Sequence, residues 1–124
     1  MFKYFNPNPS GNYTSDCVIR ALCGVLGMNW EDVYLGVCLK GLELHSMPDI
    51  NFVWGTYLQQ KGFSRFYMPS TCPLCFTVRD FCNRYSTGRY ILATEGHVIA
   101  VIDGDYYDTA DTGDEVPIYF WKET

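Results

Sequence analysis

The chain lacks long apolar runs and is poor in basic side chains. No uninterrupted apolar stretch approaches the roughly 20 residues of a membrane span, and the N-terminal segment MFKYFNPNPSGNYTSD has no apolar block of the kind found in export signals. We therefore expect a cytoplasmic protein without a membrane partner. Nine Lys and Arg against 14 Asp and Glu give a net charge of -5. That sign argues against a phosphate backbone as partner, so we expect no binding to nucleic acid.

Histidine is also scarce, whereas cysteine is not. The sequence holds only two histidines, His45 and His97, but six cysteines. In a cytoplasm the cysteines are expected to remain reduced thiols rather than a disulfide framework. Any chemistry that pairs a thiol with an imidazole must therefore use one of these two rings.

The pattern of apolar residues predicts one α+β domain over residues 1–124. Residues 1–13 are rich in Asn, Pro and Gly and predict an N-terminal arm. Residues 14–87 predict a mainly helical part, with helices near 16–26, 29–41, 49–60 and 77–84 and a strand near 63–68. From residue 88 the apolar period changes from about 3.6 to 2, which predicts an antiparallel sheet over 88–124 with strands at 89–94, 97–102, 105–108 and 116–121.

The segment TSDCVIRAL places Cys17 at the start of the first helix. Thr14 or Ser15 is the expected N-cap, and the unpaired N–H groups of a helix N-terminus stabilise a thiolate. A small, partly polar stripe is expected to be the only exposed side of this helix, and it consists of Cys17, Arg20, Ala21 and Gly24. Arg20 is interpreted either as a ligand for a substrate carboxylate or as a salt-bridge partner. Cys17 is either an activated nucleophile or a buried, inert thiol.

His97 and Asp108 are predicted to meet through a β-hairpin. Asp103-Gly104 is a strong two-residue hairpin signal, and pairing around it sets residue 101 opposite 106 and residue 99 opposite 108. Side-chain alternation then places His97 and Asp108 on one face of the sheet. Asp108 is therefore expected to orient the His97 ring, with Asp111 as the alternative.

The order of these residues resembles that of the papain-like cysteine peptidases. In that superfamily a Cys opens a central helix, a later His opens a strand and an Asn or Asp follows on the next strand. Asp16-Cys17 and Gly96-His97-Val98 resemble motifs of the bacterial double-glycine leader peptidases, and Asp108-Thr109-Ala110 is similar to the Asn-Ser-Trp of papain-type enzymes. The chain also resembles small papain-like proteins of phages and bacterial mobile elements.

This resemblance implies a papain-like α+β fold and a cysteine-dependent hydrolase. Cys17 would be the nucleophile, His97 the general base and acid, and Asp108 the residue that orients His97. The implied reaction is acyl transfer that cleaves a peptide or isopeptide bond. The partner is a peptide or protein substrate, no cofactor is required, and the location is the cytoplasm of a bacterial or phage-infected cell.

Two positions depart from the papain pattern. Gly11 stands where papain-like enzymes usually have the Gln whose amide helps to bind the oxyanion, so Asn12 and Asn8 are the candidate amides. Ala110 stands where the pattern has a Trp that shields the His–Asn hydrogen bond from water. Both departures favour the alternative hypothesis, a papain-like module with weak or no catalysis that binds a host or phage protein.

The segment TCPLCF raises a separate possibility. Cys72 and Cys75 have the C-x-x-C spacing of a zinc or redox pair, and Cys82 follows seven residues later. Because no second close pair of cysteines exists, we expect two packed thiols beside a proline turn in preference to a metal site.

Overall fold

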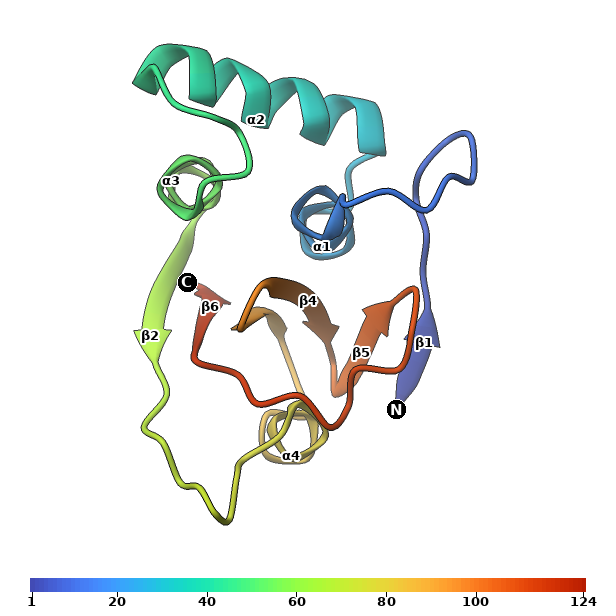
Figure 1. Cartoon of the computed structure of the whole chain (residues 1–124), viewed down its shortest axis with the longest axis vertical. Helices are drawn as coiled ribbons and strands as arrows, with labels where there is room; N and C mark the ends of the chain where they lie inside the picture. The colour runs from blue at the N-terminus through green and yellow to red at the C-terminus, as the bar shows by residue number, and fades with distance from the viewer.

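A six-stranded mixed sheet forms the frame of the protein (Figure 1). The computed structural model describes all residues, 1–124. Its strands are β1 (Phe2–Tyr4), β2 (Phe63–Tyr67), β3 (Arg89–Thr94), β4 (His97–Ile102), β5 (Asp105–Asp108) and β6 (Tyr119–Glu123). In space they follow the order β1-β5-β4-β3-β6-β2.

Four helices cover the two faces of this sheet, which confirms the predicted α+β class. They are α1 (Cys17–Leu26), α2 (Trp30–Leu44), α3 (Asn51–Gln60) and α4 (Val78–Arg84). Figure 1 shows α1 and α3 on one side of the sheet, with α2 beyond them, and α4 on the other side. No helix combines the length and the apolar character that crossing a bilayer requires.

The central strands are apolar on both faces because each face has its own core. In β4, Val98 and Ala100 belong to the core beneath α1, α2 and α3. Ile99 and Val101 belong to the second core, which α4 covers. This alternation with period 2 fixes which side chains of β4 face α1.

The sheet is wider than the predicted antiparallel sheet over 88–124, and it is not purely antiparallel. β1 pairs in parallel with β5, so part of the predicted N-terminal arm is a strand, and β2 pairs with β6. A three-residue strand is too short to show a period, which is why the pattern missed β1. β6 begins at Tyr119 and not at residue 116, because Pro117 has no N–H to donate to a ladder.

Side chains cap two of the four helices at their N-termini. Asn29 accepts a hydrogen bond from the Asp32 N–H, and Thr77 and Asp80 form a capping box. The N-cap of α1, however, is Asp16 and not Thr14 or Ser15, and its side chain makes no cap hydrogen bond. That carboxylate is held by other partners, described below.

The stripe formed by Cys17, Arg20, Ala21 and Gly24 faces the sheet, so the prediction that it is exposed is wrong. Arg20 and Ala21 are buried, with 6% and 2% of their surface exposed. At Gly24 an added Cβ would lie 3.1 Å from the Ala100 Cβ of β4. The small residue lets α1 approach the sheet closely, and this approach positions Cys17.

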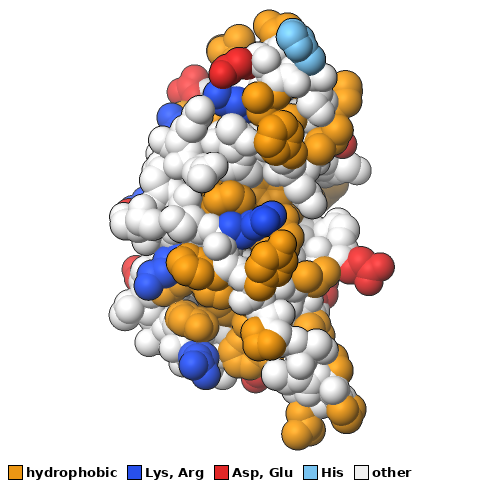
Figure 2. Space-filling view, turned by 90° about the vertical axis from the view of Figure 1, so that its left-hand side faces the viewer, with side chains coloured by type: hydrophobic (Ala, Val, Ile, Leu, Met, Phe, Trp, Pro, Cys, Tyr) orange, Lys and Arg blue, Asp and Glu red, His pale blue; other side chains and the backbone are white.

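The exposed edge strand β2 carries aromatic side chains on either side of one basic side chain, that of Arg65. The Arg65 guanidinium lies over the rings of Tyr67 and Tyr119, at 5.2 Å and 5.4 Å from their centres. Figure 2 shows the same mixture over the face on which α3 and β2 lie. Positive charge on an edge strand discourages pairing with another sheet.

We predict that Gly24→Val destabilises the protein by about 1–3 kcal/mol, because the added atoms overpack the contact between α1 and β4. Helix propensity alone favours valine over glycine by a few tenths of a kcal/mol. The sign of the change in the free energy of unfolding, measured by urea denaturation, therefore separates the two effects. A stabilised variant would contradict the close approach.

Candidate active site

Cys17, His97 and Asp108 lie together at one end of the sheet. Cys17 is the first residue of α1, His97 is the first residue of β4, and Asp108 is the last residue of β5. Cys17 and His97 both line a cavity of about 470 Å³ beside the β3–β4 turn. The structure thus brings together all three residues that the sequence singled out for a catalytic site.

The contact between His97 and Asp108 is short and buried. His97 Nε2 lies 2.7 Å from Asp108 Oδ2, and only 1% of the Asp108 surface is exposed. The hairpin has the predicted register. Val101 lies opposite Tyr106, and Ala100 lies opposite Tyr107. The turn at Asp103-Gly104 therefore carries Asp108 back to His97.

Two further donors hold the Asp108 carboxylate in place. The Thr109 N–H donates to Oδ1 over 2.7 Å, and the Thr112 hydroxyl donates to Oδ2 over 2.9 Å. Burial raises the pKa of Asp108, but the hydrogen bond and charge of His97, together with these two donors, lower it below its ordinary value. The carboxylate is therefore ionised at neutral pH.

Asp111, the alternative partner for His97, belongs to a different cluster. Its Oδ1 accepts hydrogen bonds from the Tyr106 hydroxyl and the Gly113 N–H, and it lies 3.7 Å from Arg79. The structure thus resolves the two candidates in favour of Asp108 as the carboxylate that contacts His97.

The Cys17 thiol is half-buried beside the His97 ring. Burial raises the pKa of Cys17, but a hydrogen bond with His97, the charge of His97, the Val98 N–H and the charge of Arg20 lower it to a net value below the ordinary one. Because His97 Nε2 is taken by Asp108, Nδ1 is the ring nitrogen left to face the thiol.

The same contacts act on His97 in the opposite sense. Hydrogen bonds to Asp108 and Cys17 raise the pKa of His97 to about 10, against the opposing effect of burial. A lowered thiol pKa and a raised imidazole pKa favour a thiolate–imidazolium pair at neutral pH. The arrangement therefore places a thiol whose ionisation is favoured beside an imidazole that can donate a proton.

Arg20 links α1 to the Asp108 carboxylate. Its guanidinium lies 3.0 Å from Asp16 Oδ1 and 3.1 Å from Asp108 Oδ1, and all three side chains are buried. Trp30 Nε1 donates to the other Asp16 oxygen over 2.9 Å. Of the two interpretations of Arg20, the salt bridge is confirmed. Its spacing of four residues from Asp16 was visible in the sequence, whereas its pairing with Asp108 was not.

The asparagines expected at the oxyanion hole do not line the cavity. Asn8 accepts a hydrogen bond from the Ser10 N–H through its side chain, and Asn12 is exposed. Instead, Asn51 of α3 lines the cavity. Its Oδ1 accepts from Trp54 Nε1 over 3.1 Å, which leaves its amide N–H groups as donors. Sequence reasoning missed Asn51 because it looked only near the papain position.

The cavity continues into a larger apolar one. The second cavity, of about 520 Å³, shares Ser15, Val18 and Asp49 with the first. Aromatic and apolar side chains such as Trp30 and Tyr34 form much of its wall. The two cavities therefore adjoin each other, and Cys17 lies on the wall of the smaller one.

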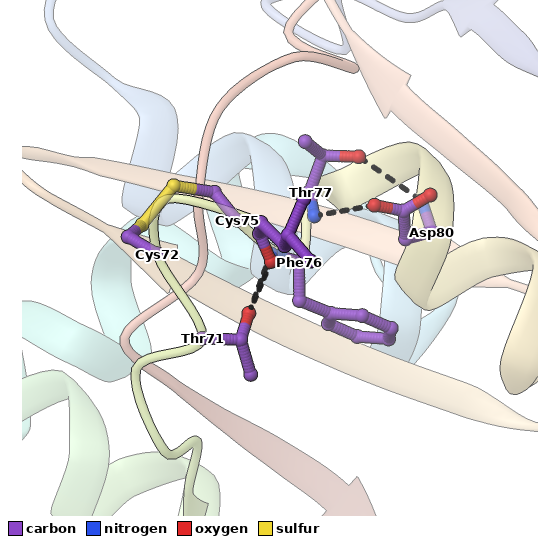
Figure 3. The surroundings of a disulfide bond; sticks show 7 residues. Thr71, Cys72, Cys75, Phe76, Thr77 and Asp80 are labelled. Carbon is purple, nitrogen blue, oxygen red and sulfur yellow. Dashed lines mark hydrogen bonds between the residues drawn. A yellow bond between two sulfur atoms is a disulfide. The ribbon is translucent and has the colours of Figure 1, made fainter.

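The C-x-x-C segment is a disulfide and not a zinc site or a pair of free thiols. Cys72 and Cys75 are bonded to each other in an exposed loop (Figure 3). Cys82 lies buried on α4 within the second core. No three His, Cys, Asp or Glu side chains are placed to share a metal ion. The zinc candidate is therefore wrong, since both sulfurs of the pair are already bonded.

Comparisons with known proteins identify no relative. No protein family, curated protein or solved structure matches the chain. A functional proposal must therefore rest on the geometry and electrostatics of the site.

We predict that Asp108→Asn lowers the pKa of His97 from about 10 toward its ordinary value of 6.5, because the charge that favours the imidazolium is removed. The matched variant Asp111→Asn leaves the His97 titration unchanged. NMR titration of the imidazole protons of both variants measures this. An equal fall in the two variants would show that Asp108 has no special role.

Proposed function

We propose that the protein is a cysteine-dependent hydrolase that cleaves a peptide or isopeptide bond by acyl transfer. One observation carries the proposal: a single imidazole ring, that of His97, contacts a buried carboxylate and lines the same cavity as a thiol at a helix N-terminus, whose pKa it lowers. This is the arrangement of nucleophile, base and orienting group that acyl transfer requires. A thiol or a buried histidine on its own would not indicate acyl transfer.

In the first half-reaction, the Cys17 thiolate attacks the carbonyl carbon of the substrate and forms a C–S bond. The carbonyl electron pair moves onto oxygen, and the His97 imidazolium then protonates the leaving nitrogen as the C–N bond breaks. The products are a free amine and a thioester on Cys17. In the second half-reaction, neutral His97 takes a proton from water, whose oxygen attacks the thioester, and the acid and thiolate are released. Asp108 stabilises the imidazolium in both halves.

The developing oxyanion needs hydrogen-bond donors. The Cys17 N–H is one, because the first turn of α1 has no side-chain cap. We assign the second donor to the Asn51 amide, which lines the same cavity. Asn51 would thus take the place of the Gln that is Gly11 in this sequence.

A papain-like fold is part of this proposal. In its support, the helix that carries Cys17 packs across β4 of a sheet whose strands supply His97 and Asp108 in the papain order. The two adjoining cavities beside the thiol, of about 470 and 520 Å³, offer space for substrate side chains. Two departures from the papain resemblance are Gly11 in place of the Gln and Ala110 in place of the Trp.

A second candidate function is favoured by the exposure of His97. With Ala110 in place of a shielding aromatic residue, 23% of the His97 side chain is exposed to solvent. Water at the His97–Asp108 pair would weaken catalysis, and the two cavities would then serve a binding module for a host or phage protein. The two candidates differ in whether Cys17 is chemically activated.

We predict that iodoacetamide alkylates Cys17 at pH 6 at least roughly tenfold faster than it alkylates the other thiols, because only the thiolate reacts. Cys23 and Cys82 are internal controls, since burial raises the pKa of each to about 11. Peptide mapping by mass spectrometry gives the rate at each site in one experiment.

His97→Gln is the companion variant for this measurement. Burial would remain while the partner of the thiol is lost, so the pKa of Cys17 would rise and its alkylation at pH 6 would fall by at least about tenfold. An ordinary profile for Cys17 in the unaltered protein would support the binding module and contradict the hydrolase.

We predict that Asn51→Ala lowers kcat by about 10²-fold on a peptide that the protein cleaves, since one oxyanion donor is lost. Asn8→Ala and Asn12→Ala serve as matched controls and retain kcat. Cleavage of a peptide mixture, followed by mass spectrometry, identifies a usable substrate. Loss of kcat in Asn12→Ala but not in Asn51→Ala would reverse the assignment.

A further inference from the structure

The side chains around the site form a closed ring of contacts. Cys17 follows Asp16 in the chain, Asp16 pairs with Arg20, and Arg20 pairs with Asp108. Asp108 binds His97, and His97 faces Cys17. The nucleophile and the carboxylate that orients its base are thus connected twice, once through His97 and once through Arg20.

We propose that Arg20 is a positioning residue that fixes α1 and β5 relative to each other, so that the Cys17 thiol and the His97–Asp108 pair stay in register. The inference rests on the proposed function of these three residues. It assigns a role to a residue that contacts neither the Cys17 thiol nor the walls of the two cavities.

The geometry of the guanidinium supports a fork rather than a single ion pair. One terminal nitrogen contacts Asp16 and the other contacts Asp108, at 3.0 Å and 3.1 Å. A planar guanidinium with rigidly spaced donors holds two carboxylates at a fixed separation, which the ammonium of a lysine does not. Arg20 therefore holds the first turn of α1 at a fixed distance from the end of β5.

Each carboxylate is in turn fixed by neutral donors. Trp30 Nε1 holds the second oxygen of Asp16, and Thr112 shares the second oxygen of Asp108 with His97. These donors restrict rotation of both carboxylates. With two buried carboxylates and one imidazole around it, the Arg20 charge is also needed to keep the cluster near neutrality.

Arg20 acts on the nucleophile by charge as well. Its positive charge is among the groups that lower the pKa of Cys17. The other charged groups near the thiol are His97, which also lowers that pKa, Asp16, which Arg20 neutralises, and the Asp49 and Glu95 carboxylates on the wall of the same cavity. Loss of Arg20 would therefore disturb both the alignment and the ionisation of Cys17.

The test compares alkylation of Cys17 by iodoacetamide over pH 5–9 in the full chain and in three variants. In Arg20→Met the rate at pH 6 is expected to fall about tenfold and the profile to move to higher pH. Arg20→Lys, which restores the charge without the fork, is expected to recover only part of the rate. Arg79→Met, which removes an exposed arginine that also faces two carboxylates, retains the full profile.

A merely structural role for Arg20 would lower the free energy of unfolding but leave the profile of the folded variant unchanged. A folded Arg20→Met with the unaltered profile would therefore overturn the inference. Where Arg20→Met does not fold, Arg20→Lys decides, and an unaltered rate in that variant would overturn the fork. If Cys17 is unreactive at pH 6 in the unaltered protein, the proposed function fails first, which distinguishes the two failures.

Discussion

The Asp108 carboxylate is a charge buried at the end of a four-residue strand, and burial of an unpaired charge costs several kcal/mol. The structure avoids that cost by surrounding the carboxylate with donors from three segments of the chain: His97 from β4, Arg20 from α1, and Thr109 and Thr112 from its own loop. Each of these partners has to be in place for the others to be satisfied. The need to pair one carboxylate therefore fixes the N-terminal end of the first helix against the sheet.

That helix is brought to the sheet by packing. Val98 and Ala100 of β4 form the floor on which α1 lies, and Gly24 lets the helix approach closely. Leu22 and Val25 are fully or nearly fully buried beneath α2 and α3, so α1 is enclosed on most sides. The apolar core thus sets the position of the helix axis. The ion pairs of Arg20 then fix its N-terminal end, where Cys17 stands.

The pairing of His97 with Asp108 was within reach of sequence reasoning because each step was local, whereas the place of Cys17 beside them was implied only by the resemblance in chain order. A two-residue turn at Asp103-Gly104 fixed the hairpin register, and alternation placed His97 and Asp108 together. The link from Arg20 to Asp108 spans 88 positions and has no local pattern. The strand near 63–68 was predicted, but its pairing with β6 and the pairing of β1 with β5 were not, since pairing between distant segments leaves no period in the sequence. Asn51 was missed because it reaches the cavity only through the packing of α3.

The central claim is that Cys17 becomes acylated with help from His97, and p-nitrophenyl acetate tests it most directly. The account predicts a burst of nitrophenolate that approaches one equivalent per chain, with the acetyl group on Cys17. The burst should be absent in Cys17→Ser and strongly reduced in His97→Gln. Slow, linear release of nitrophenolate without a burst, or acetyl groups spread over lysines and Cys38, would contradict it.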